Sequence, residues 1–267
     1  MRLHVHEWGD AAAPPLVCVH GVSAHGRRFR KLAEERLASR FHVLAPDLRG
    51  HGFSEHDPPW DIATHTHDVL DTLAELGVRE AAWVGHSFGG RLVIELASLA
   101  VPERIRCAVL LDPAIQILPH VGYDFAQQAA LDHSFATEDE AIEARLTGTA
   151  LTPRAFVEEE AREHLTSSPD GRLRWRCSRA AVATMYSELC REPPPPTVLD
   201  GIPTLLVHAS HFGLVREEQL EEYEGVLGGG LEAVAVDGGH IVYWDAYEET
   251  ADAVEKFLIR HRDVSHP

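Results

Sequence analysis

Short apolar runs alternate with longer stretches of helical spacing through the first half of the chain. Four apolar runs lack polar alternation: residues 16–20, 42–46, 82–85 and 107–112. Such runs are typical of strands buried on both faces of a parallel sheet. Three stretches between them favour helices: residues 28–38, 64–76 and 87–100. In the second, Val69, Leu73 and Leu76 recur at helical spacing. The alternation predicts a doubly wound, mostly parallel α/β sheet.

This rhythm stops between residues 113 and 196, where the chain is helical and charged, without convincing strands. The stretch ends in four prolines at 193–196, a stiff extended connector. Strand patterns return at 204–207 and 231–236, followed by a closing helix over 246–260. We therefore expect one catalytic core, residues 1–112 and 197–262, with a helical lid over 113–196. A second small domain unrelated to the site is the alternative.

Composition and charge limit the classes of binding partner that we expect. The chain has 267 residues, of which 45% are hydrophobic, and a formal net charge of −18. A surface this acidic repels nucleic acid and anionic membranes, so we expect a small-molecule partner and leave open a homo-oligomer. The first residues lack the apolar region of a signal peptide, and no stretch approaches the roughly 18 apolar residues of a membrane span. Four scattered cysteines favour a reduced, cytoplasmic setting.

A serine between a strand and a helix carries the strongest chemical signal. Gly85-His86-Ser87-Phe88-Gly89-Gly90 fits G-x-S-x-G. A serine on so sharp a turn has its hydroxyl above the sheet, and the glycines relieve crowding. We interpret Ser87 as a nucleophile; an inert serine in a structural turn is the alternative.

Two further segments supply what such a serine needs. His20-Gly21-Val22 follows the first buried strand, and the N–H groups of Val22 and Phe88 would form an oxyanion hole. We expect the His20 side chain only to brace the turn. A serine hydroxyl also needs a base. Among 18 histidines, His240 stands in a glycine-flanked loop after the last strand, which favours it as the general base.

Together these motifs, with Asp47-Leu48-Arg49-Gly50-His51-Gly52-Phe53-Ser54, resemble the α/β-hydrolase superfamily. The most similar branch contains bacterial esterases, lactonases, haloperoxidase-like enzymes and carbon–carbon bond hydrolases. The resemblance implies an eight-stranded sheet with a helical lid, no cofactor, and a structural role for the 47–54 loop, in which Arg49 is a brace.

The chain departs from that pattern at the triad acid. The family usually carries the acid after the strand at 204–207, but here no carboxylate occurs until Glu217. Asp112, at the end of the preceding strand, is the best substitute, since some members of the superfamily place the acid there. It could also simply start the lid. Asp237 lies near His240 in sequence but is expected to point elsewhere, and an acid-free dyad stays open.

Other residues carry weaker signals. His25, Phe53, Trp60 and His86 are candidates for substrate binding, with ordinary packing as the alternative. Five lid aromatics would cover the substrate or pack together: Tyr123, Phe125, Phe156, Trp175 and Tyr186. The pairs His4 with His6 and His65 with His67 have metal-like spacing but no accompanying carboxylate or cysteine cluster in the sequence, so we expect no metal.

A serine nucleophile favours acyl transfer over dehalogenation, because an ether to serine cannot be hydrolysed as an ester to aspartate can. The leading hypothesis is hydrolysis of a small or medium carboxylic ester or lactone through an acyl-enzyme. A carbon–carbon bond hydrolase, an acyltransferase and an inactive ligand-binding homologue are the alternatives.

Overall fold

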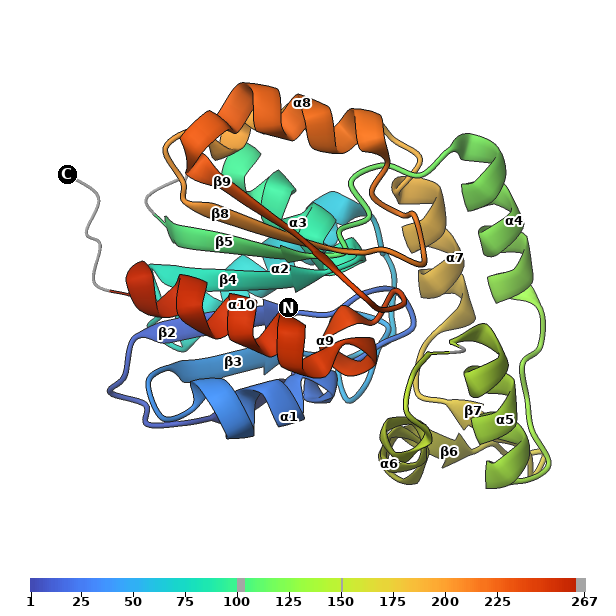
Figure 1. Cartoon of the computed structure of the whole chain (residues 1–267). Helices are drawn as coiled ribbons and strands as arrows, with labels where there is room; N and C mark the ends of the chain where they lie inside the picture. Colours follow the sequence, from blue (N-terminus) through green and yellow to red (C-terminus); the bar gives the residue numbers. More distant parts are fainter. Residues whose placement is uncertain (100–103, 150, 263–267) are drawn as a thin grey trace.

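Seven strands of the described residues form one sheet, in the order β1-β3-β2-β4-β5-β8-β9 (Figure 1). The structure is a computed structural model that describes residues 1–99, 104–149 and 151–262. The strands are β1 (Val5–Trp8), β2 (Pro15–Val19), β3 (His42–Pro46), β4 (Ala81–His86), β5 (Ile105–Leu111), β8 (Thr204–Ala209) and β9 (Leu231–Val236). All neighbours pair in parallel except β1, which runs antiparallel to β3.

The predicted mostly parallel α/β fold is confirmed, with two differences. Within the described residues the main sheet has seven strands where we expected eight, and a single antiparallel strand, β1, forms one of its edges. The apolar pattern did not predict β1, because its four residues mix polar and apolar side chains and none is fully buried.

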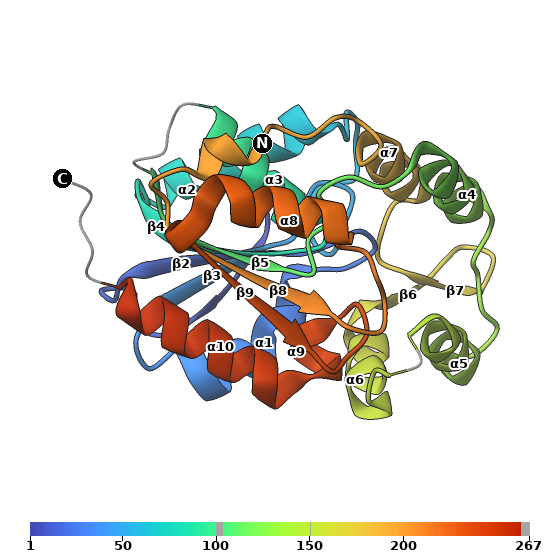
Figure 2. The same ribbon diagram turned by 45° about the horizontal axis from the view of Figure 1, so that its top comes forward.

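Helices cover both faces of the sheet (Figure 2). One face packs against α2 (Ile62–Glu75), α3 (Phe88–Ser98) and α8 (Glu217–Leu227). The other packs against α1 (Arg30–Leu32), α9 (Val242–Asp245) and α10 (Tyr247–Arg260). In β2, Val17 and Val19 belong to the first core, and Leu16 and Cys18 to the second. Since successive side chains of a strand point to opposite faces, an uninterrupted apolar run fills both cores.

The helix boundaries have local causes. Helix α2 begins where the Asp61 carboxylate accepts the Thr64 N–H at 2.9 Å. The helix predicted over 28–38 is present but irregular, with a 3₁₀ turn over Gly26–Phe29 and a π-helical turn over Ala33–Leu37 on either side of α1. Of the helix predicted over 87–100, α3 ends at Ser98, and residue 100 lies outside the described residues.

Residues 113–196, which we call the insertion, follow β5 and precede β8 in the chain, and their elements lie beside the sheet (Figure 1). Their elements are α4 (Pro119–Ala130), α5 (Glu138–Gly148), α6 (Arg154–His164), β6 (Leu165–Ser167), β7 (Leu173–Trp175) and α7 (Arg179–Glu188). The expectation of no strands here is wrong, because β6 and β7 pair antiparallel. Each has only three residues, too few to show a periodicity.

Ion pairs join the insertion to the core. Three arginines after β2 pair with three glutamates of α6: Arg27 with Glu163, Arg28 with Glu160, and Arg30 with Glu159. The middle pair is buried and the outer two are partly exposed. We call this set the α6 ladder. None of the helices formed by the described residues combines the length and apolar character that crossing a bilayer requires.

Candidate active site

Ser87 stands on the sharp turn between β4 and α3. Its φ of 54° and ψ of −116° place an L-residue in strained backbone. The glycines beside it are sterically required. A Cβ on Gly89 would lie 2.1 Å from the carbonyl oxygen of Val19, and one on Gly85 would lie 2.4 Å from that of Gly89. At this motif the end of β4 and the start of α3 approach each other and the end of β2 closely, and Ser87 stands on the turn between β4 and α3.

His240 lies in the loop after β9 and contacts Asp112 at the end of β5. Its Nδ1 is 2.6 Å from Asp112 Oδ2. A carboxylate only accepts hydrogen bonds, so Nδ1 donates and Nε2 keeps its lone pair. The other oxygen of Asp112 accepts the Ala209 N–H at 3.1 Å, and the side chain is fully buried. The carboxylate is thus held by β8, with one oxygen left for the imidazole.

Ser87 and His240 line the same cavity, which has a volume of about 1020 Å³. The Ser87 hydroxyl makes no hydrogen bond within the described part of the chain, so it is open to a ligand. The His240 ring is stacked on Phe212 at 4.7 Å, and its backbone carbonyl accepts His86 Nε2–H at 2.9 Å. Burial, with the neighbouring His240, lowers the pKa of His86 well below its usual range, so His86 is neutral.

The candidate oxyanion donors stand beside the serine. Val22 lines the cavity, and Phe88 is the first residue of α3; neither N–H has a partner within the described ranges. His20 braces this turn: Nδ1–H donates to the Gly21 carbonyl at 2.8 Å, and Nε2 accepts the Leu48 N–H at 2.9 Å. Burial lowers the pKa of His20 well below its usual range, which keeps it neutral and able to accept.

The four candidate binding residues divide into two groups. Phe53 and His86 line the cavity. His25 and Trp60 are not among the lining residues, because other elements cover them. The His25 ring is stacked on His164 at 3.3 Å, and Trp60 packs beside Gly50, where a Cβ would lie 3.2 Å from the indole nitrogen.

The insertion's aromatic residues also divide. Phe125, Trp175 and Tyr186 line the cavity. Phe156 instead stacks on Trp244 of the core at 4.9 Å, and Tyr123 is 62% exposed. Three of these five aromatic side chains therefore form cavity wall, and Phe135 of the insertion lines the cavity as well.

Sequence reasoning missed a group of arginines. The cavity's charged lining residues are Arg28, Arg145, Arg174, Arg176, Arg179 and Asp132. They come from separate elements and belong to no motif. Only an excess of arginine in 172–179 hinted at them.

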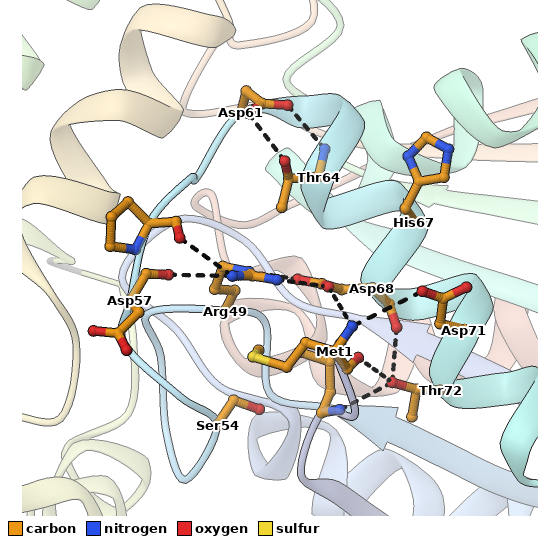
Figure 3. A network of polar contacts seen from close by, with 12 residues as sticks. Met1, Arg49, Ser54, Asp57, Asp61, Thr64, His67, Asp68, Asp71 and Thr72 are labelled. Atoms are coloured by element: carbon orange, nitrogen blue, oxygen red, sulfur yellow. Dashed lines mark hydrogen bonds and ion pairs between the residues drawn. The ribbon is translucent and has the colours of Figure 1, made fainter.

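The 47–54 loop is held by polar contacts, as Figure 3 shows for Arg49. Arg49 donates to both carboxylate oxygens of Asp68 on α2, at 2.6 and 2.8 Å, and the Met1 amino group donates to the same carboxylate at 3.1 Å. Burial opposes ionisation of Asp68, but these hydrogen bonds outweigh it and lower its pKa. Arg49 does not line the cavity, and its contacts are those of a brace.

His4 and His6 have a carboxylate neighbour that the sequence did not suggest. One ring nitrogen of each histidine and one carboxylate oxygen of Asp47, the atoms that could bind a metal ion, lie within 4.8 Å of one another. The Asp47 carboxylate already accepts the Gly26 N–H at 2.7 Å and the Phe53 N–H at 2.9 Å. These contacts give Asp47 a structural role that needs no ion.

Comparisons with known proteins identify the family to which the chain belongs. A family model described as the alpha/beta hydrolase fold matches residues 14–247. The chain belongs to this family. Like other α/β-hydrolases it is a hydrolytic enzyme.

Lipase LipV of Mycobacterium tuberculosis is 32% identical over 243 residues, covering 90% of this chain and 91% of the relative. The sn-1-specific diacylglycerol lipase ABHD11 of Mus musculus is 26% identical, covering 94% and 82%.

Two solved structures are similar over nearly the whole chain. The crystal structure of E-2-(acetamidomethylene)succinate hydrolase has a TM-score of 0.83 at 25% identity and covers 96% of this chain and 95% of its own. A marine microorganism esterase has a TM-score of 0.77 at 20% identity, covering 97% and 100%.

Proposed function

We propose that this α/β-hydrolase cleaves a small or medium carboxylic ester or lactone through an acyl-enzyme on Ser87. The observation that carries the proposal is the 2.6 Å contact between Asp112 and His240 at the wall of the cavity that Ser87 lines. It leaves His240 Nε2 as a proton acceptor, which a serine hydroxyl needs at neutral pH.

The proposed reaction has two halves. Ser87 Oγ attacks the carbonyl carbon while His240 Nε2 takes its proton, and Val22 and Phe88 N–H groups stabilise the oxyanion. His240 then gives the proton to the leaving alcohol. In the second half, water attacks the acyl-enzyme with His240 again as base, and the acid is released as Ser87 recovers its proton. Asp112 orients the imidazole and stabilises its charge throughout.

Two further observations support the assignment. The relatives named above as lipases point to an ester substrate. The insertion supplies part of the cavity wall, including Trp175 and Tyr186, in keeping with a lid over residues 113–196 on a core of 1–112 and 197–262. The inactive-homologue alternative was motivated by the missing acid after β8, and the Asp112 contact favours turnover instead.

The test is active-site labelling. A fluorophosphonate should label the wild-type protein, and Ser87→Ala should abolish both labelling and turnover of an ester and lactone panel. Ser168→Ala is the matched control, because Ser168 lines the same cavity from the turn that follows β6, without contacting the proposed machinery. Normal turnover by Ser87→Ala would refute the mechanism. Mass analysis of products separates hydrolysis from acyl transfer and from carbon–carbon bond cleavage.

A further inference from the structure

The cavity wall has a charge opposite to that of the molecule. The chain carries a formal charge of −18, yet the cavity's lining residues include five arginines and one carboxylate. Arg174 and Arg179 are compensated, since both approach Asp132, and Arg174 also pairs with Asp170 at 2.8 Å. The remaining arginines are not balanced in this way.

Arg28 and Arg145 share one carboxylate. Both donate to the same oxygen of Glu160, at 2.7 and 3.0 Å, and the other oxygen is buried without a partner. Arg145 also donates to the Ser23 carbonyl, next to the proposed oxyanion turn, and its guanidinium lies 4.3 Å from the Trp175 ring centroid. Its Nε is buried without a hydrogen bond. Two guanidinium groups therefore share a single carboxylate oxygen at this side of the cavity.

Arg176 has no acidic partner among the described residues. Its guanidinium lies 4.6 Å from the centroid of the Phe53 ring, and its Nε is buried without a hydrogen bond. The backbone is fixed on both sides, because Gly52 N–H donates to its carbonyl and its own N–H donates to that of His164. A guanidinium held in place without a counter-charge is costly unless a ligand supplies one.

We infer that the substrate carries a carboxylate, bound by Arg176 together with Arg145 in the cavity of Ser87 and His240. This rests on the proposed function and adds the substrate's charge to it. A planar guanidinium accommodates a carboxylate through two parallel hydrogen bonds, and an aromatic face keeps it oriented. Arg28 and Arg145 share one glutamate and Arg176 has no acidic partner within the described ranges, so an anionic ligand also offsets the positive charge of the cavity wall.

The test compares esters that differ only in charge. One pair has the charge on the acyl side: the 4-nitrophenyl monoester of glutaric acid and its neutral carboxamide analogue. The other has it on the alcohol side: the butyrate esters of 4-hydroxybenzoate and 4-hydroxybenzamide. In at least one pair, kcat/KM should favour the acid by about 10- to 100-fold, as for a hydrogen bond between charged groups.

Arg176→Gln should reduce that preference at least fivefold, and Arg176→Lys should restore part of it. Arg174→Gln is the matched control: it removes a guanidinium two residues away that Asp132 and Asp170 already neutralise, so the preference should be retained. Equal rates for acid and amide in both pairs, or a preference that survives in Arg176→Gln, would overturn the inference while leaving Ser87 chemistry intact.

Failure of the proposed function has a different signature. In that case no ester turns over and fluorophosphonate leaves Ser87 unlabelled. Calorimetric titration of wild type and Arg176→Gln with glutarate and 4-hydroxybenzoate then decides the inference alone. Binding of either acid that weakens at least tenfold in Arg176→Gln supports the carboxylate site, and no binding by wild type overturns it.

Discussion

Asp112→Asn gives the sharpest test of the proposed triad. Asparagine tolerates positive φ, so it suits the φ of 38° at this position. In the wild type, Asp112 Oδ1 accepts the Ala209 N–H. The amide oxygen of the asparagine keeps this contact and therefore takes the position of Oδ1. The amide NH₂ then faces His240 Nδ1, which must become the acceptor. The proton moves to Nε2, the nitrogen that has to receive the serine proton.

The expected loss has two parts. Replacing a charge-assisted hydrogen bond to the imidazolium costs about 1.5–3 kcal/mol in the transition state. The wrong tautomer adds a comparable amount, since the ring must exchange its proton before each turnover. Together these reduce kcat about 10³- to 10⁴-fold.

The assay is steady-state hydrolysis of the best ester of the panel, with thermal unfolding to establish that the variant is folded. Asp237→Asn is the control, because Asp237 is 79% exposed and contacts His211 rather than His240; its kcat should stay within threefold of wild type. A folded Asp112→Asn that keeps more than a tenth of wild-type kcat would refute the assignment of Asp112 as triad acid.

Four other substitutions test the fold around the site. Ser87→Gly should lose all turnover yet gain about 1–3 kcal/mol of unfolding free energy in urea, because glycine relieves the strained φ; a loss of stability would contradict this. Gly89→Ala should cost about 3 kcal/mol in the same assay, since its Cβ meets a β2 carbonyl at 2.1 Å. Gly225→Ala in α8, with open space around the new methyl, should instead gain about 1 kcal/mol, and equal effects at the two glycines would argue against the steric reasoning. Arg49→Met should cost about 2 kcal/mol at pH 7, because it removes a charged partner of Asp68. The Asp68 pKa is lowered in the folded state, so its stabilisation exists above the unfolded pKa of about 3.9 and is lost as pH falls. The difference in stability between Arg49→Met and wild type should therefore narrow as the pH falls below about 3.9, and a constant difference would show that the carboxylate is not responsible.

The core of the fold could be predicted because its signals are local. Uninterrupted apolar runs identified the central strands, whose residues fill cores on both faces of the sheet. The serine turn was recognisable because glycines at 85 and 89 are sterically required there. Asp112 could be proposed because strand ends in a parallel sheet meet at one edge, which brings the end of β5 toward the loop after β9. Its catalytic role remains a prediction.

Contacts between residues that lie far apart in the sequence could not be predicted. The carboxylate beside His4 and His6 is Asp47, about forty positions along the chain, and antiparallel pairing of β1 with β3 brings them together. Arg145 reaches its glutamate only when α5 and α6 pack. His25 looked like a cavity residue because it follows the oxyanion turn, but α6 covers it. No single-sequence pattern encodes these encounters.

The α6 ladder opposes separation of the insertion from the core. If the insertion swung away as one body about its two connections to the core, three guanidinium–carboxylate pairs would separate, one of them buried. Helix α4 forms no ion pair with any residue in the described ranges, so displacing it alone leaves the ladder intact. If ligands enter by displacement of α4 alone, the rate of ligand entry should be nearly independent of ionic strength. If they enter by movement of the whole insertion, the rate should rise with salt, because salt screens the two outer ion pairs of the ladder.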